Sequence, residues 1–123
     1  MKKIYILCNM RVMSDEVRQQ LEEYVIELKN KGYKVQLPHQ DDNQSKSGYE
    51  ICKQNMKYIK KADEIHIFYN NQSKGLHFDL GMAFILKKPI VVVKNELYSD
   101  GKSFPRMLKE WEKYIKKTYH EVE

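Results

Sequence analysis

Residues 64–93 read EIHIFYNNQSKGLHFDLGMAFILKKPIVVV, and this stretch decides the fold. The pattern predicts a buried strand over Glu64–Tyr69, a helix over Leu76–Leu86 and a second strand over Pro89–Val93, joined by a turn of small and polar residues. A strand, a helix and a strand in this order form a right-handed unit with two parallel strands. One carboxylate, Asp79, lies about one turn into the helix.

The same alternation continues outside this unit. Before it, the pattern predicts strands over Ile4–Cys8 and Lys34–Leu37, with a helix between them that Ser14 caps and Gly32 ends. A further helix is predicted over Tyr49–Lys61. The last predicted helix is amphipathic and carries Phe104, Met107, Leu108, Trp111 and Ile115.

Strands that alternate with helices predict an α/β fold. We expect a single-domain three-layer sandwich over residues 1–123, with a four- or five-stranded parallel sheet of the flavodoxin-like or Rossmann-like type. The last residues, 118–123 (TYHEVE), are expected either to add a short edge strand or to fray.

Composition is ordinary for a globular chain, because 41% of the 123 residues are hydrophobic and 32% are charged. The apolar runs are too short to span a membrane, and the N-terminus reads as a strand rather than as a signal peptide. Cys8 and Cys52 are expected to be reduced thiols in a cytoplasmic protein. No ligand cluster has metal-binding spacing, and we expect neither a metal nor another cofactor.

The net charge is +5, but the lysines are dispersed in pairs along the predicted helices. They form no basic stripe interleaved with aromatic residues, so we expect no polymeric nucleic acid as a partner. A solvated basic surface of this kind favours a small anionic ligand.

Ligands of open parallel sheets bind beyond the carboxyl ends of the strands. In this chain, these ends are Asn9–Arg11, His39–Asp42, Asn70–Gly75 and Asn95–Asp100. The turn at Asn70–Gly75 opens a helix, whose first N–H groups suit an anion such as phosphate; the same residues also suit an ordinary strand-to-helix turn.

The side chains at these ends allow more than one role. Asp79 is either a nucleophile or stabiliser for an oxocarbenium-like sugar carbon, or a carboxylate that satisfies the helix dipole; its position alone favours the second. Arg11 is an anion clamp or a surface cation, and Tyr5 a donor in the crevice or a core residue. We do not expect Cys8 to be a nucleophile, because no histidine activates it in sequence, and His39 reads as an ordinary loop residue.

Residues 73–90, SKGLHFDLGMAFILKKPI, resemble the signature of the nucleoside 2-deoxyribosyltransferase superfamily, and within it that of the 2'-deoxynucleoside 5'-phosphate N-hydrolases. That signature is a Ser-x-Gly or Gly-Thr loop, then Glu-Leu-Gly, then an Ala-rich helix ending in Gly-Lys-Pro. The pair Ala62-Asp63 and a first strand with Tyr5, followed by Arg11, also match, so the resemblance covers residues 3–93. The matching residues of the signature are Ser73, Gly75, Leu80, Gly81, Ala83, Lys88 and Pro89.

The resemblance implies a two-carboxylate mechanism, in which a carboxylate attacks the anomeric carbon of a nucleoside and the base leaves. By position, Asp79 replaces the family's nucleophilic Glu, and Tyr5 orients it. Asn55 stands where the family usually carries another catalytic Asp, and an amide there binds a hydroxyl or a base but moves no proton.

The resemblance also implies where the substrate binds. Ser73 and the N–H groups after it would hold the phosphate or hydroxymethyl end, with Arg11 as a second contact. Asn9 stands where the phosphohydrolases have a Ser, and Ser103 is the candidate for a Ser that a neighbouring subunit supplies, which implies a homodimer. The substrate-binding residues implied in this way are Asn9, Arg11, Asp63, Ser73, Gly75 and Ser103.

Three functions therefore remain open at this stage. The first is an enzyme that cleaves or transfers the N-glycosidic bond of a nucleoside or its 5'-monophosphate, with Asp79 as nucleophile. The second is a family member that only binds or senses a nucleotide, as the two altered carboxylate positions suggest. The third is an unrelated function, such as partner binding through the last helix and Trp111.

Overall fold

The structure is a computed structural model that describes residues 1–38, 47–95 and 103–122, with side chains to residue 114. The predictions on His39–Asp42 and on residues 96–100 lie outside the described residues. In chain order, the elements are β1 (Lys3–Leu7), the short 3-10 helix η1 (Met10–Val12), α1 (Asp15–Asn30), β2 (Lys34–Gln36), α2 (Gly48–Lys61), β3 (Glu64–Tyr69), α3 (Lys74–Ile85), β4 (Ile90–Asn95) and α4 (Phe104–Val122).

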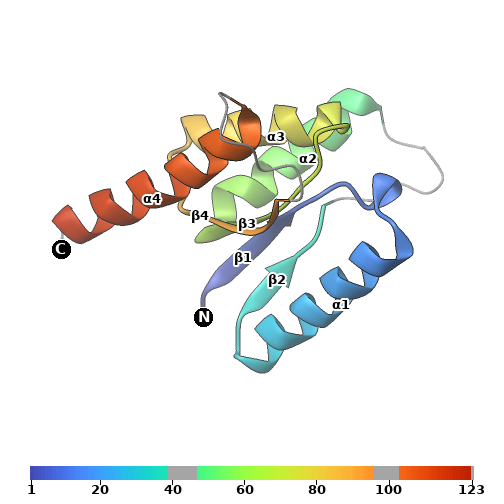
Figure 1. Ribbon diagram of the computed structural model, residues 1–123, viewed down its shortest axis with the longest axis horizontal. Helices are drawn as coiled ribbons and strands as arrows, with labels where there is room; N and C mark the ends of the chain where they lie inside the picture. Colours follow the sequence, from blue (N-terminus) through green and yellow to red (C-terminus); the bar gives the residue numbers. More distant parts are fainter. Residues whose placement is uncertain (39–46, 96–102, 123) are drawn as a thin grey trace.

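The four strands form one parallel sheet in the order β2-β1-β3-β4 (Figure 1). Helix α1 lies on one face of the sheet, and α2, α3 and α4 lie on the other. The predicted three-layer α/β sandwich is therefore confirmed, with four strands among the described residues. The end of the chain continues α4 to Val122, so the predicted alternative of an edge strand after residue 117 is wrong.

Local signals in the sequence set the helix ends. The Ser14 hydroxyl accepts a hydrogen bond from the main-chain N–H of Val17 and caps α1, as predicted. Gly32 adopts a φ of +89°, a conformation that favours glycine, directly after α1. Ser73 caps α3 in the same way as Ser14 caps α1, so α3 begins at Lys74, two residues before the predicted start.

Two cores hold the layers together. Residues of β1 and β3 that point towards α2, α3 and α4, such as Tyr5 and Ile67, pack with Leu80 and Trp111. Trp111 is 5% exposed and meets Phe84 edge to face at 5.2 Å. Trp111 is thus a core residue, so it is not available for the partner binding through the last helix that the third alternative proposes.

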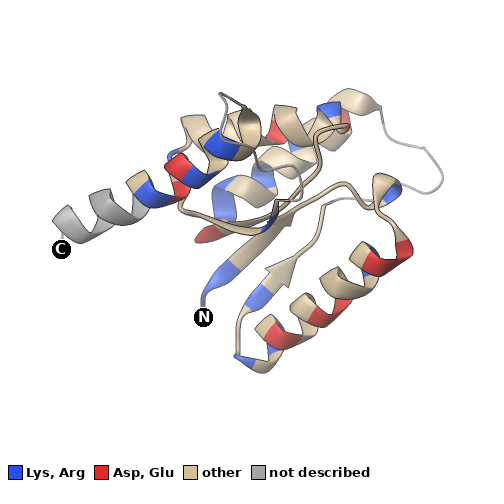
Figure 2. Cartoon of the chain, in the orientation of Figure 1, with Lys and Arg blue, Asp and Glu red and all other residues tan. Residues whose placement is uncertain are grey.

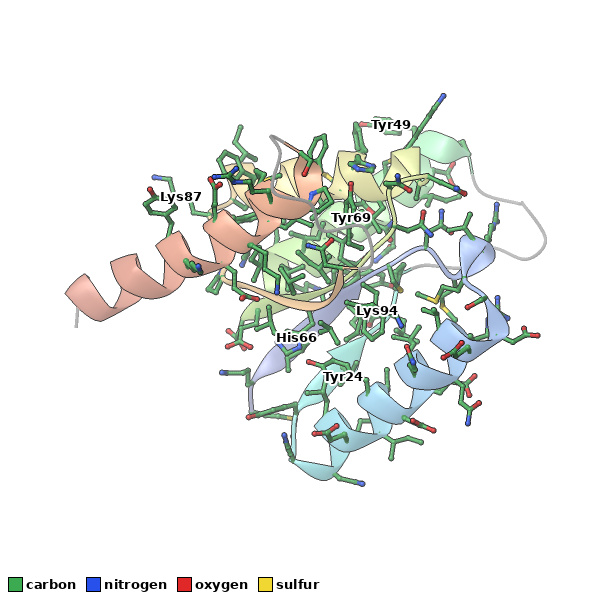
Figure 3. All side chains as sticks on the ribbon, in the orientation of Figure 1. Tyr24, Tyr49, His66, Tyr69, Lys87 and Lys94 are labelled. Atoms are coloured by element: carbon green, nitrogen blue, oxygen red, sulfur yellow. The ribbon has the colours of Figure 1, made fainter. Side chains whose placement is uncertain are left out.

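The face towards α1 contains a buried polar chain. The Tyr24 hydroxyl of α1 donates to Nδ1 of His66 in β3 at 2.5 Å, and Nε2–H of His66 donates to Glu64 at 2.9 Å (Figure 3). Glu64 also pairs with Lys2 at 2.8 Å. Burial lowers the pKa of His66, against the opposing effect of Glu64, so the imidazole is neutral in this chain of hydrogen bonds.

Strand order places the candidate site. The chain leaves β1 towards β2 on one side and returns to β3 on the other, so a crevice opens between the carboxyl ends of β1 and β3. Over the described residues, none of the helices combines the length and apolar character needed to cross a membrane.

Candidate active site

A cavity of about 270 Å³ lies at this crevice, on the face covered by α2 and α3. Its polar lining comes from the loop after β1, from α2, and from α3 with the turn that precedes it. The residues around it are Cys8, Asn9, Met10, Arg11, Pro38, Ile51, Asn55, Ser73, Gly75, Leu76 and Asp79.

Asp79 contributes the cavity's carboxylate. Burial raises its pKa to about 6, and the Asn55 amide, which donates to the carboxylate at 3.5 Å, opposes this shift. The buried side of α3 consists of Leu76, Leu80 and Ala83. Phe78, next to it, is 58% exposed and does not face the core, whereas Asp79 faces the crevice.

Tyr5 lies behind this carboxylate, inside β1. Its hydroxyl is buried and has no hydrogen-bond partner among the described residues. Burial raises the pKa of Tyr5, and the negative charge of Asp79 raises it further. The phenol is therefore neutral.

Ser73 lies at the other end of the cavity and is 3% exposed. Its hydroxyl oxygen accepts from the N–H of Leu76 at 3.1 Å and from the Asn9 amide at 2.8 Å. A hydroxyl oxygen has two acceptor positions, and these two bonds fill both. What the hydroxyl can still do is donate its own proton.

The Asn9 side chain is fixed in turn. Its amide oxygen accepts from the N–H of Arg11 at 3.1 Å and caps η1. The exposed Arg11 lines the same end of the cavity. A side chain at Gly75 would meet no atom within 4 Å, so the first turn of α3 is open to a ligand, and the N–H groups at a helix start suit an anion.

His77 braces the turn from the opposite side. Its Nδ1–H donates to the carbonyl oxygen of Ser73 at 2.6 Å, so Nε2 is the acceptor for the Tyr69 hydroxyl at 2.9 Å. The sequence analysis missed this brace. The only signal is that His77 follows Ser73 by four residues, which places both on one helical turn.

Two residues from the sequence analysis do not reach the cavity. Asp63 precedes β3 and lies at the amino end of the sheet, where its carboxylate accepts from the N–H of Lys3 at 2.7 Å. Ser103 lines a separate hollow with Tyr69, His77 and Phe104. The cavity thus brings together Asn9, Arg11, Asn55, Ser73, Gly75 and Asp79, with Tyr5 close enough to Asp79 to feel its charge but outside the lining, and leaves Asp63 and Ser103 elsewhere.

The cavity also has an apolar wall that the sequence analysis missed, formed by Met10, Pro38, Ile51 and Leu76. The four-residue spacing of Ile51 and Asn55 was the available signal, because it places both on one side of α2. Burial raises the pKa of the Cys8 thiol to about 12, so Cys8 is no thiolate nucleophile at neutral pH. Within the described ranges, no three His, Cys, Asp or Glu side chains gather as metal ligands.

No protein-family model and no curated protein matches the sequence. Among solved structures, the chain is similar to the CMP N-glycosidase of Clostridium botulinum, with a TM-score of 0.65 and 21% identity over 95% of this chain and 97% of that one. It is also similar to a 2-desoxiribosyltransferase from Leishmania mexicana (TM-score 0.60, 20% identity, 85% and 81% covered). A 2-deoxyribosyltransferase from Bacillus psychrosaccharolyticus gives a TM-score of 0.62 at 20% identity, with 79% and 77% covered.

These likenesses define the class of fold. The chain has the fold of nucleoside 2-deoxyribosyltransferase-like proteins, so the resemblance drawn from residues 73–90 is confirmed at the level of the fold. At about one identical residue in five, these likenesses show the fold alone.

Proposed function

We propose that the protein cleaves or transfers the N-glycosidic bond of a nucleoside or its 5'-monophosphate, with Asp79 as the nucleophile. One observation carries the proposal: a partly buried carboxylate with a raised pKa lies in a cavity at the sheet's switch point, and the same cavity is lined by the start of α3, which suits anions. The similar solved structures include an N-glycosidase and two deoxyribosyltransferases, which supports the same reaction class.

In this reaction, an oxygen of Asp79 forms a bond to the anomeric carbon, and the base leaves with the electron pair of the C–N bond. Water then hydrolyses the glycosyl ester, or a second base displaces the carboxylate. A pKa of about 6 leaves Asp79 mostly ionised at neutral pH, as a nucleophile must be. The Asn55 amide, which already donates to the carboxylate, holds it in place.

The other residues at the site would each bind a different part of the substrate. The Ser73 hydroxyl, the open turn at Gly75 and the Arg11 guanidinium would hold the 5' end of the sugar. The Tyr5 hydroxyl, which lies behind Asp79 and outside the cavity lining, would donate to the reacting carboxylate and orient it. The apolar wall would cover the base, because planar rings bind best against apolar side chains.

The test is to incubate purified protein with nucleosides, deoxynucleosides and their 5'-monophosphates, and to measure free base by chromatography. We expect base release from at least one of them, abolished by Asp79→Ala. A 2-deoxy-2-fluoro nucleoside should leave a glycosyl adduct on the peptide with Asp79, detectable by mass spectrometry. Equal base release from the wild type and Asp79→Ala would refute Asp79 as the nucleophile.

A second candidate is a module that binds the same ligands without turnover. The observation that favours it is Asn55, an amide that contacts Asp79 where the resembling enzymes carry a second carboxylate. It predicts that a nucleotide raises the melting temperature of the wild type and not of Arg11→Ala, while no base is released from any substrate.

We further propose that the protein is a cytoplasmic homodimer. Helix α3 exposes Phe78 and Ile85, and α4 exposes Tyr114, so these two helices present large apolar side chains to solvent. Size-exclusion chromatography with light scattering tests this assembly. We expect a particle of about twice the 14.8 kDa chain, and a monomer for the variant Phe78→Ser/Ile85→Ser.

A further inference from the structure

A second cavity, of about 210 Å³, lies at the amino end of β1, away from the candidate active site. It opens between α2 and the strands β1 and β2, where Lys34 and Gln36 of β2 are exposed. Figure 2 shows basic residues at the start of β1, at the start of β2 and at the end of α2. Three ammonium groups line the cavity, those of Lys3, Lys34 and Lys61.

Two of these lysines are opposed in the sheet. Lys3 of β1 and Lys34 of β2 are direct partners in the parallel register. Like charges at directly opposed positions on neighbouring strands destabilise the pair. Lys61 adds a third positive charge from α2, and none of the three ammonium groups forms an ion pair within the described part of the chain.

The neighbouring lysines Lys88 and Lys2 have structural partners, whereas the ammonium groups of Lys3, Lys34 and Lys61 have no such role within the described residues. The Lys88 ammonium, and not Lys61, binds carbonyl oxygens at the end of α2, those of Lys60 at 2.8 Å and Ala62 at 2.9 Å. Lys2 is paired with Glu64. A lysine on the edge strand β2 deters pairing with another sheet, but this accounts only for Lys34.

The cavity also has an aromatic wall and a polar one. Tyr58 lines it in front of the buried Tyr5, with the two ring centroids 6.0 Å apart, and Gln36 contributes an amide. Asp63 lies beside Lys3, but its carboxylate is engaged by a main-chain N–H, so the three lysines still outnumber it. The cavity is concave and small, a shape that fits a compact anion rather than a polymer.

We propose that this lysine-lined cavity is a second anion site, which binds a small phosphate-bearing molecule. Ammonium groups bind phosphate oxygens as compact charges, and three of them supply the charge that a phosphate or pyrophosphate group needs. Binding relieves the repulsion between Lys3 and Lys34. The partly exposed Tyr58 ring gives an attached organic group a surface to pack on.

The test is an NMR titration of the labelled protein with pyrophosphate, because the amide signals separate this cavity from the candidate active site. We expect saturable shifts at Lys3, Lys34 and Lys61. The variant Lys3→Gln/Lys34→Gln/Lys61→Gln should bind at this cavity at least about tenfold more weakly. The matched control Lys29→Gln/Lys53→Gln/Lys113→Gln removes the same charge elsewhere and should bind within about twofold of the wild type.

Three results would overturn the proposal. Equal weakening in both triple variants would show attraction to overall charge only. Shifts confined to residues around Arg11 and Ser73 would show a single anion site, at the candidate active site. Tighter binding of a single-stranded oligonucleotide than of pyrophosphate to the same lysines would identify a polymer surface. As an independent measure, Lys34→Gln alone should raise the melting temperature of the protein without ligand, and an unchanged or lower value would contradict the repulsion.

Discussion

Replacing Asp79 by Asn should make the folded protein more stable at neutral pH. The pKa of Asp79 rises from 3.8 to about 6 because burial disfavours the charged form. A shift of about 2 pKa units corresponds to about 3 kcal/mol of destabilisation when the carboxylate is ionised. Because Asp79 is only partly buried, solvent screens part of this cost, and we expect Asp79→Asn to gain about 1–2 kcal/mol at pH 7.5.

The gain should depend on pH in a defined direction. The folded state binds a proton at Asp79 more readily than the unfolded state between pH 6 and 3.8, so the wild type gains stability as pH falls through this range. Below pH 3.8 both states are protonated, and the difference between wild type and Asp79→Asn should vanish. The amide still accepts from Asn55, so this contact is kept.

Urea unfolding at pH 7.5, 6 and 4.5, followed by the fluorescence of the buried Trp111, measures this difference. Glu22→Gln, at an exposed position of α1, is the control and should change stability little at any of these pH values. An Asp79→Asn variant that is less stable than the wild type at pH 7.5, or whose gain is the same at pH 4.5, would refute the reasoning.

Four further outcomes are expected. If Asp79 is the nucleophile, the logarithm of kcat/KM for base release should fall with a slope of one below about pH 6, measured on whichever substrate is cleaved. Asn9→Ala frees the Ser73 hydroxyl to rotate, so KM for a 5'-monophosphate should rise about tenfold, with a smaller change in kcat, in steady-state assays. Tyr5→Phe removes a buried hydroxyl without a partner among the described residues, so urea unfolding should show equal or greater stability, by up to about 1 kcal/mol. Burial lowers the pKa of His66, so the neutral imidazole contributes stability that is present above pH 6.5 and is lost as pH falls through the folded-state pKa of His66. In the Asp79→Asn background, the free energy of unfolding should therefore decrease on acidification from pH 7. The decrease should be smaller when His66→Phe is added.

The layers of the fold could be predicted because strands buried on both faces and capped helices leave strong local patterns. The orientation of α3 was harder to predict. Eight of the eleven residues after Gly75 are apolar, so the helix has no single hydrophobic stripe, and the sequence alone does not separate Phe78 from Leu80 as a core residue. The structure buries Leu76, Leu80 and Ala83 instead, because this side of α3 meets β1, β3 and α2.

The gathering of site residues followed from one rule, that the carboxyl ends of parallel strands share an edge of the sheet. Asn9 and Ser73 obey it, and Asn55 reaches the same edge because α2 runs antiparallel to the strands. Asp63 was grouped with them through its motif alone. Since it precedes β3, the same rule places it at the opposite edge, where the structure has it.

The direction of the hydrogen bonds at Ser73 could not be predicted from the sequence, because it depends on a contact with Asn9, which is 64 positions away. With both acceptor positions of Ser73 filled by Asn9 and Leu76, the hydroxyl can only donate into the cavity. A fully ionised phosphate group only accepts hydrogen bonds, whereas a sugar hydroxymethyl group also needs an acceptor for its own hydroxyl proton. We therefore expect the 5'-monophosphate to be preferred to the free nucleoside, and Asn9→Asp, whose carboxylate takes the Ser73 proton, to reverse that preference.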